Sequence, residues 1–315
     1  MLAFAGSNAL AVECVSVIGS EPGVPNITMD PAFVNTGDDS YQLNAVYNRL
    51  VNLDTNFLPV PKLAKSWEIS EDGKTWTFNL EAGVTFHDGK PMTARDVVFS
   101  FQRLVDPEVG SPAAGLLSFL VPDKIKAVDD LTVTFTTDEV VADLPTMLAN
   151  KYGMVVPEGS TKEALKLKGN GTGPFVQDVY DPTQTRRVFQ RNKHYWRAGL
   201  PKAECLELSV VTEEVTRLAA IKSGAADLIM QAGPANAAIL AGDTSLKLER
   251  SAPGSYMTLS MWVDTPPYDD VRVRQALKKV IDRQMLVDTL TLGNGVAEND
   301  TPVPPTSSEA FMLYP

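Results

Sequence analysis

The fold is decided by residues 63–80, which read LAKSWEISEDGKTWTFNL. An Asp-Gly pair, Asp72-Gly73, lies near the middle of this stretch. Apolar residues alternate with polar ones on both sides of it, namely Trp67, Ile69, Trp76, Phe78 and Leu80. A period of two on either side of an Asp-Gly turn predicts a β-hairpin with one buried face.

The residues that follow the hairpin predict a helix and a second hairpin. A turn at Asp88-Gly89 precedes Thr93, and Thr93-x-x-Asp96 has the form of a capping box. The predicted helix buries Val97, Val98, Phe101, Leu104 and Val105. Residues 125–135 then predict a hairpin around Asp129-Asp130.

A different pattern occupies residues 205–230. Residues 205–211 form a mostly apolar strand, Thr212 caps a helix that ends at Gly224, and residues 227–230 form a short strand. We expect Val215, Leu218 and Ala219 on the buried face of the helix. Strand, helix and strand in this order predict a βαβ unit with a parallel sheet.

Further elements are predicted on both sides of these blocks. Residues 14–18 read as a strand, and residues 32–40 as a polar loop. Residues 256–263 read as an apolar strand, and Asp270 and Asp282 each begin a helix. The helical period is carried by two sets of apolar residues, first Leu43, Val46, Tyr47 and Leu50, then Val273, Ala276, Leu277, Val280 and Ile281.

Composition and charge limit the function classes. The 315 residues carry 28 Lys and Arg against 39 Asp and Glu, a net charge of −11. Such an acidic balance argues against nucleic acid or an anionic membrane as the main partner. No run of 18 apolar residues occurs, so the sequence predicts no transmembrane helix. The length favours roughly two domains.

The N-terminus and the cysteines leave alternatives open. Ala9-x-Ala11 has the form of a signal cleavage site, so residues 1–13 are either the tail of a truncated secretory signal or a short apolar N-terminus. Cys14 and Cys205 could form a disulfide, but we expect two separate buried thiols. With only two Cys and two His, no Cys/His metal site is expected.

No catalytic or nucleotide-binding set is expected. The glycine-rich stretch 169–174 lacks the Lys-Ser/Thr of a P-loop and is followed by a strand, so we interpret it as a tight crossover. His87 and Asp88 are adjacent on a strand and face opposite ways, so His87 is expected to be structural. Glu213 and Glu214 suit the first turn of a helix better than an acid–base pair.

Several blocks together resemble a known family. They are residues 63–78, residues 83–97, GTGPF at 171–175, RNKHYW at 191–196, and DDVRVRQAL at 269–277 with Ile281-Asp282-Arg283. The chain is similar in these blocks, and in their order, to the extracellular solute-binding proteins of ABC importers, family 5. These bind oligopeptides and dipeptides, and relatives bind nickel, opines or glycosides.

The resemblance implies an α/β, periplasmic-binding-protein-like fold of two lobes (class II, cluster C type). Residues 1–45 and 170–262 would form the core α/β lobe. Residues 46–169 would form a hairpin-rich α+β insertion, and residues 263–315 the start of the second lobe. Family members continue beyond this point, so the second lobe is expected to be incomplete. The acidic residue that holds a peptide's amino terminus in peptide-binding members would lie in the missing part.

The resemblance also implies a ligand site and a cellular role. The expected ligand-binding residues come from the segment after Asp30-Pro31, the loop after residues 227–230 and the hinge strand. They are Asn35, Thr36, Gly37, Asp38, Gln231, Ala232, Gly233, Tyr256, Met261 and Trp262. Backbone groups on loops would bind an extended solute, and aromatic side chains would cover it.

The expected protein is a periplasmic or extracellular receptor and not an enzyme. It would act as a monomer without cofactors, metal or nucleic acid. It would close on a peptide or similar small polar solute and deliver it to a membrane permease. The alternatives are a sensory or interaction module that reuses the fold and, less favoured, a hydrolase that uses His87.

Overall fold

A computed structural model describes residues 14–20, 28–34, 37–177, 186–249 and 258–297 of the chain. The signal-like residues 1–13 and the predicted site residues Asn35, Thr36 and Tyr256 lie outside the described residues. The chain divides into two compact units, one of residues 5–231 and one of residues 232–315 together with 1–4. They are called here the larger and the smaller unit, and each is described by itself.

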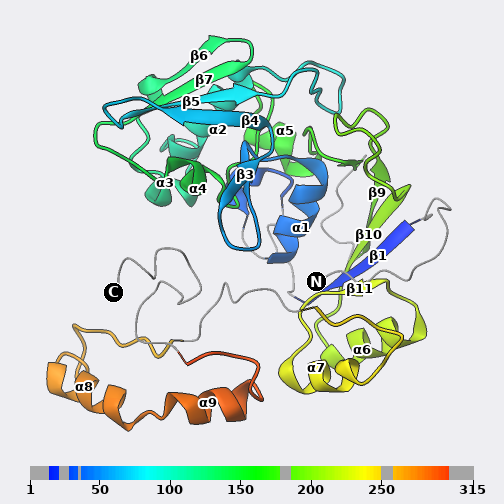
Figure 1. Ribbon diagram of the computed structural model, residues 1–315, viewed down its shortest axis with the longest axis vertical. Helices are drawn as coiled ribbons and strands as arrows, with labels where there is room; N and C mark the ends of the chain where they lie inside the picture. The colour runs from blue at the N-terminus through cyan, green and yellow to red at the C-terminus, as the bar shows by residue number, and fades with distance from the viewer. Residues whose placement is uncertain (1–13, 21–27, 35–36, 178–185, 250–257, 298–315) are drawn as a thin grey trace. The chain divides into compact units, whose positions relative to one another are not determined.

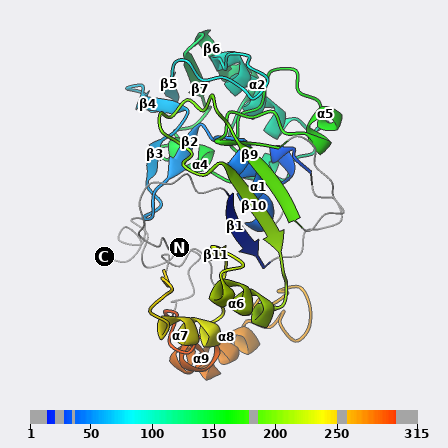
Figure 2. The same ribbon diagram turned by 90° about the vertical axis from the view of Figure 1, so that its right-hand side faces the viewer.

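A five-stranded mixed sheet forms one part of the larger unit (Figures 1 and 2). Its strand order is β11-β1-β10-β9-β8. Strand β1 (Cys14–Gly19) pairs in parallel with the central strand β10 (Cys205–Val210) and with β11 (Leu228–Ile229). Antiparallel pairing adds β9 (Arg186–Arg191) and β8 (Phe175–Val176). Helix α6 (Glu214–Ser223) connects β10 to β11, which confirms the predicted parallel βαβ order.

Cys14 and Cys205 form a disulfide, so the prediction of two separate thiols is wrong. The two residues are direct partners in the parallel pairing of β1 and β10, with their Cα atoms 4.4 Å apart. They are 191 residues apart in the chain, so only the register of two distant strands brings them together. That register cannot be deduced from the two strand patterns alone.

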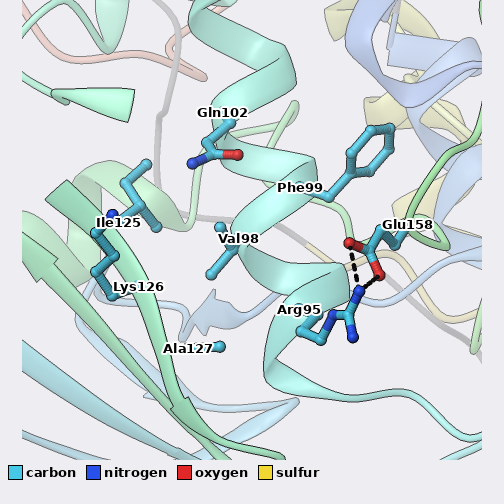
Figure 3. A pocket seen from close by; sticks show the side chains of 8 residues that line it. All are labelled: Arg95, Val98, Phe99, Gln102, Ile125, Lys126, Ala127 and Glu158. Carbon is cyan, nitrogen blue, oxygen red and sulfur yellow. Dashed lines mark hydrogen bonds and ion pairs between the residues drawn. The ribbon is translucent and has the colours of Figure 1, made fainter. Parts of the chain in front are cut away.

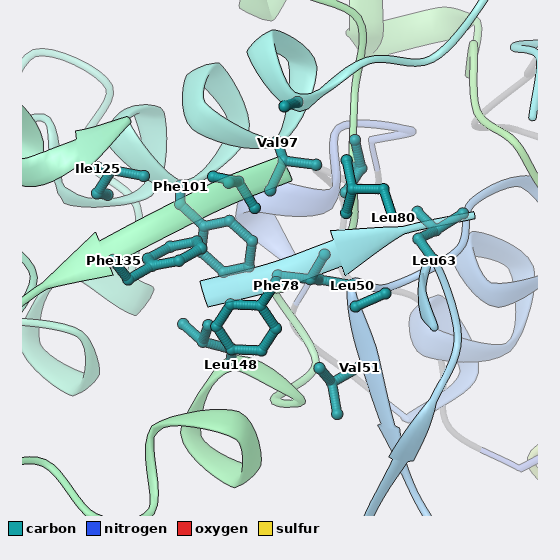
Figure 4. Packing of buried hydrophobic residues seen from close by; sticks show 14 of the residues in the cluster. Leu50, Val51, Leu63, Phe78, Leu80, Val97, Phe101, Ile125, Phe135 and Leu148 are labelled. Carbon is teal, nitrogen blue, oxygen red and sulfur yellow. The ribbon is translucent and has the colours of Figure 1, made fainter. Parts of the chain in front are cut away.

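A four-stranded antiparallel sheet, in the order β4-β5-β7-β6, forms the other part of the larger unit. The two predicted hairpins supply it as β4 (Ala64–Ile69) with β5 (Thr75–Leu80) and β6 (Ile125–Asp129) with β7 (Thr132–Thr136). Helix α2 (Ala94–Val105) covers one face (Figure 4). Phe135 meets Phe78 and Phe101 edge-on, at 5.5 and 5.2 Å between ring centroids, in the centre of this core.

The predicted capping box is confirmed at the start of α2. The backbone N–H of Thr93 donates to the Asp96 carboxylate at 2.7 Å, which satisfies a group that the helix itself cannot pair. The same carboxylate accepts from the N–H of Glu158 at 2.8 Å. Asp96 therefore fixes a distant loop to the helix start.

Short elements complete the larger unit. The 3-10 turns are Pro31–Phe33 and Pro122–Lys124. The remaining strands are β2 (Val51–Leu53) and β3 (Pro59–Pro61), and the remaining helices are α1 (Gly37–Val46), α3 (Ala113–Leu116), α4 (Leu144–Leu148) and α5 (Lys162–Leu167). Helix α1 ends at Val46, but all four residues of the predicted apolar stripe are buried. Gly37 and Asp38, expected in a loop, are the first residues of α1.

A buried ion pair joins the segment before α1 to α2. Both nitrogens of the Arg103 guanidinium fork donate to the carboxylate of Asp30, one of them at 2.8 Å, and the two side chains are only 7% and 0% exposed. Asp30 also caps the turn at Pro31 by accepting from the N–H of Ala32. The side-chain Oγ of Ser111 donates to the carbonyl of Ala32 at 2.7 Å. The Asp30 segment is therefore held from two sides.

The glycine-rich loop is a joint between the two sheets of the larger unit. A Cβ at Gly171 or Gly173 would collide with the backbone of Val46 at the end of α1. The N–H of Gly173 donates to the carbonyl of Val46 at 2.8 Å. The expected crossover is present, but none of these glycines has a positive φ. They are required for close approach of two backbones and not for an unusual conformation.

His87 belongs to this joint. Its backbone N–H donates to the carbonyl of Gly171, and its ring Nε2 lies 3.1 Å from the carbonyl of Gly173. Burial lowers the pKa of His87, partly opposed by the hydrogen bond to Gly173 and by the charge of Asp88. The neutral ring with its proton on Nε2 fits these contacts, so the predicted structural role is supported.

The smaller unit contains helices α7 (Pro234–Ala241), α8 (Val271–Val280) and α9 (Arg283–Leu290). Asp270 and Asp282 cap α8 and α9 as predicted. The apolar stripe of α8 is not buried, since Val280 is 81% exposed. The predicted strand at 256–263 is also wrong over its described part, residues 258–263, where no strand forms.

Two details of α6 differ from the prediction. Its N-cap is Glu213 and not Thr212, and Val215, expected to be buried, is 76% exposed. Ala219 is exposed as well, and Leu218 is half-buried. The buried residue of this helix is Arg217, whose role is described below.

Replacing Arg103 should lower the free energy of unfolding, because Asp30 would stay charged and buried without its partner. We expect Arg103→Met to lower the free energy of unfolding by about 3–5 kcal/mol, and Asp30→Asn/Arg103→Met to lower it by less, because the double variant leaves no buried charge. Urea unfolding measures both. Arg95→Met, which breaks the exposed pair with Glu158 on the same helix, is the control and should cost under about 1 kcal/mol. Equal losses for Arg103→Met and Arg95→Met would contradict this account.

The stability of the larger unit should fall in mild acid because of His87. Its pKa in the folded protein lies below the usual value of about 6.5, so the unfolded chain binds a proton more readily. The contribution is complete above about pH 6.5 and is lost as the pH falls from there to the folded pKa. His87→Gln can still donate to Gly173 but does not titrate. Urea unfolding between pH 5 and 8 should therefore show a shallower pH dependence for the variant, and identical curves would refute the prediction.

Candidate functional site

Three parallel strands of the larger unit end at one edge of the five-stranded sheet. Strands β1 and β10 end together at the paired residues Gly19 and Val210, and β11 ends beside β1 (Figure 2). In open α/β sheets, ligands bind outside the carboxyl ends of the strands. This edge, here called the carboxyl edge, is therefore the candidate site.

Gln231, which follows β11, is the predicted ligand-binding residue that the structure places at the carboxyl edge. Its φ of 56° is left-handed, a conformation that is uncommon for a residue other than glycine. The hydroxyl of Ser20, directly after β1, donates to Gln231 Oε1 at 2.6 Å. Strained backbone of this kind is retained where surrounding contacts impose it, and it concentrates at binding sites.

Arg217 of α6 supplies those contacts. It is 5% exposed. Its Nη1 donates to the carbonyls of Val211 and Thr212, both at 2.8 Å, and its Nη2 donates to the carbonyl of Gln231 at 3.3 Å. One guanidinium thus fixes the chain where it leaves β10 and where it leaves β11.

The other predicted site residues are not brought to this edge by the described contacts. Gly37 and Asp38 begin α1, Gly233 is the N-cap of α7, and Trp262 is 78% exposed. Ala232, Gly233, Met261 and Trp262 belong to the smaller unit. Whether these residues contact a ligand stays a prediction.

Sequence reasoning missed Ser20 and Arg217. Ser20 follows a predicted strand, and a polar residue at that position was a usable signal. Arg217 lies outside the expected apolar face of α6, and only the three-dimensional structure shows the carbonyl groups that its guanidinium reaches.

A separate groove lies between α2 and β6 (Figure 3). It has a volume of about 220 Å³ and is lined by Arg95, Val98, Phe99, Gln102, Ile125, Lys126, Ala127 and Glu158. Ligand pockets usually measure about 300–1,000 Å³. The ion pair between Arg95 and Glu158 also satisfies the charges at one end of the groove. We therefore do not assign the ligand site to it.

The described residues hold neither a candidate metal site nor a membrane-spanning helix. No group of three or more His, Cys, Asp or Glu side chains that could hold a metal ion occurs among them. In the same part of the chain, no helix is both long and apolar enough to cross a membrane.

Comparisons with known proteins agree with the resemblance. Residues 59–315 match the model of the bacterial extracellular solute-binding proteins, family 5 Middle. Heme-binding protein A of Haemophilus influenzae is 31% identical over 302 residues, which are 88% of this chain and 54% of that protein. Di/tripeptide-binding protein 1 of Pseudomonas aeruginosa is 32% identical over 299 residues, 87% of this chain and 56% of that protein.

A solved structure shows the same fold. The dipeptide binding protein of Pseudoalteromonas sp. SM9913, in complex with Met-Leu, matches with a TM-score of 0.76 at 25% identity, over 89% of this chain and 59% of that one. This confirms the predicted α/β, class II periplasmic-binding-protein-like fold. The chain spans little more than half the length of the relatives it matches.

Replacement of Arg217 should loosen the carboxyl edge. Arg217→Met removes the donor of three part-buried carbonyl groups, so we expect a loss of about 1–2 kcal/mol in unfolding free energy and faster hydrogen exchange in the loops after β10 and β11. Lys222→Met, at an exposed position of the same helix, is the matched control and should change stability by under about 0.5 kcal/mol. Unchanged exchange in both loops would show that Arg217 does not hold them.

Proposed function

Because the chain belongs to the bacterial extracellular solute-binding proteins of family 5, we propose that it is part of a receptor of an ABC-type importer. The receptor captures a peptide or a similar small polar solute and delivers it to a membrane permease. It acts as a monomer in the periplasm or outside the cell. The named relatives are binding proteins and not enzymes, so the hydrolase alternative is not carried forward.

The observation that carries this proposal is the strained Gln231 at the carboxyl edge. Its backbone is held by Arg217, and its side chain is held by Ser20. Oε1 of Gln231 accepts the hydrogen bond of Ser20, so the amide nitrogen Nε2 on the other side of the amide carbon points away from Ser20. Such a fixed amide can donate to a carbonyl or carboxylate oxygen of a solute.

A peptide is the ligand class that best fits this edge and the relatives. Extended peptides are bound largely through their main-chain carbonyl and N–H groups, which need polar partners at fixed positions. One of the relatives is named as a di/tripeptide-binding protein, and the structural match holds the dipeptide Met-Leu. A second relative is named for heme, so heme is the comparison ligand in the test below.

The disulfide supports the proposed location. Disulfides persist in oxidising compartments such as the bacterial periplasm and the cell exterior, and they are rare in the cytosol. Cys14 and Cys205 are both used in this bond. Their pairing favours export of the protein.

The test is a thermal-shift screen of di- and tripeptides, with heme as the comparison ligand. A ligand that binds only the native state stabilises it by about 2.7 kcal/mol at 100 times Kd, so a true ligand raises the Tm in a concentration-dependent way. Mass spectrometry of the released ligand should find it chemically unchanged. A screen in which no peptide raises the Tm would reject the peptide assignment, and an altered peptide would reject the receptor.

Gln231 provides the residue-level test. We expect Gln231→Ala to weaken peptide binding by roughly tenfold, the effect of losing about 1.4 kcal/mol of hydrogen bonding. Gln190→Ala, at an exposed position of β9, is the matched control and should bind as the unmodified chain does. Equal affinities of the two variants would place the ligand elsewhere.

A further inference from the structure

A second polar cluster lies at the other end of β10. Strand β10 runs from Cys205 to Val210, and the loop of residues 192–204 that leads into it follows β9. This loop meets the base of the β2–β3 hairpin, where Lys62 follows β3. The cluster therefore has no residue in common with the carboxyl edge, which lies beyond Val210.

The indole ring of Trp196 is the platform of this cluster. Its Nε1 donates to Asn48 Oδ1 at 2.9 Å, and its ring centroid is 5.7 Å from that of Tyr195. Lys62 Nζ lies 5.8 Å from the centre of the same ring, and Arg197 Cζ lies 5.6 Å from it. Two cationic side chains thus lie within cation–π distance of one ring.

Neither cation has a carboxylate partner among the described residues. Lys62 donates to Tyr195 Oη at 3.3 Å, and neither Lys62 nor Arg197 takes part in an ion pair with another described residue. Burial, and then the positive charge of Arg197, lowers the pKa of Lys62 to about 8. Two positive charges are therefore held close enough to repel each other.

Tyr195 positions the Lys62 ammonium beside the ring. Burial raises the pKa of its hydroxyl, which stays protonated at neutral pH, and a hydrogen bond with the Asn48 side chain opposes this shift. The oxygen accepts from Lys62. The Lys62 ammonium and the Arg197 guanidinium lie beside the same indole ring, a combination suited to a carboxylate or phosphate group.

We propose that Lys62 and Arg197 form a binding site for a small oxyanion, a carboxylate or a phosphate, on the Trp196 platform. The bound anion relieves the repulsion between the two cations. Lys62 and Arg197 donate to its oxygens, and the indole ring shields one side of Lys62 from water. The site is independent of the proposed solute site at the carboxyl edge.

The test is a titration of the full chain with sodium phosphate or sodium acetate at pH 7, with sodium chloride used to keep the ionic strength constant. A specific site gives a saturable rise in Tm of roughly 2–4 °C at about ten times Kd. Lys62→Gln and Arg197→Gln should abolish the rise. Lys65→Gln removes one exposed positive charge from β4 and should retain it. A rise that persists in Lys62→Gln and Arg197→Gln, or no rise in the unmodified chain, overturns the proposal.

A second readout reports on Lys62 itself. In a chain whose lysines carry ¹³C-labelled methyl groups, the Lys62 signal, assigned with Lys62→Gln, should titrate near pH 8 in chloride. In saturating phosphate its pKa should rise, because an adjacent anion favours the charged amine. Equal pKa values in chloride and phosphate would also overturn the proposal.

Discussion

The larger unit depends on one close contact between backbones, that of the Gly169–Pro174 loop with the end of α1. Gly171 and Gly173 leave no room for a side chain against Val46, and the N–H of Gly173 bonds to the Val46 carbonyl. The His87 side chain reaches this loop from the segment between β5 and α2, and the Asn192 side chain reaches it from the end of β9. The position of one sheet against the other is therefore set where these short segments meet.

The same unit fixes its strand ends by contacts between residues far apart in the sequence. The disulfide fixes the start of β1 against the start of β10, and Arg217 fixes the exits of β10 and β11. With both ends of the parallel strands held, the left-handed backbone of Gln231 can persist although it is unfavourable by itself. Strain at the candidate site is thus maintained by rigidity elsewhere in the sheet.

The parts of this structure that were predictable from the sequence are those formed by residues that lie close together in the chain. The turn at Asp72-Gly73 and the capping box of Thr93 and Asp96 are local hydrogen-bonding patterns, and both are present. The Cys14–Cys205 bond and the Asp30–Arg103 pair join residues 191 and 73 positions apart, and no local pattern encodes them. For the site, family resemblance indicated the loop of Gln231. The contacts by which Ser20 and Arg217 hold this residue are visible only in the three-dimensional structure.

The two ends of β10 show how the surroundings of a cation decide its role. Arg217 is buried, and both of its terminal nitrogens donate to backbone carbonyl oxygens. It therefore stabilises the chain and has little capacity to bind a ligand. Lys62 and Arg197 lie beside the same aromatic ring, and no acidic group of the described residues is paired with either. In a chain with 39 acidic residues against 28 basic ones, a carboxylate partner is readily available in sequence. A cation pair that lacks one is therefore left to bind an external anion.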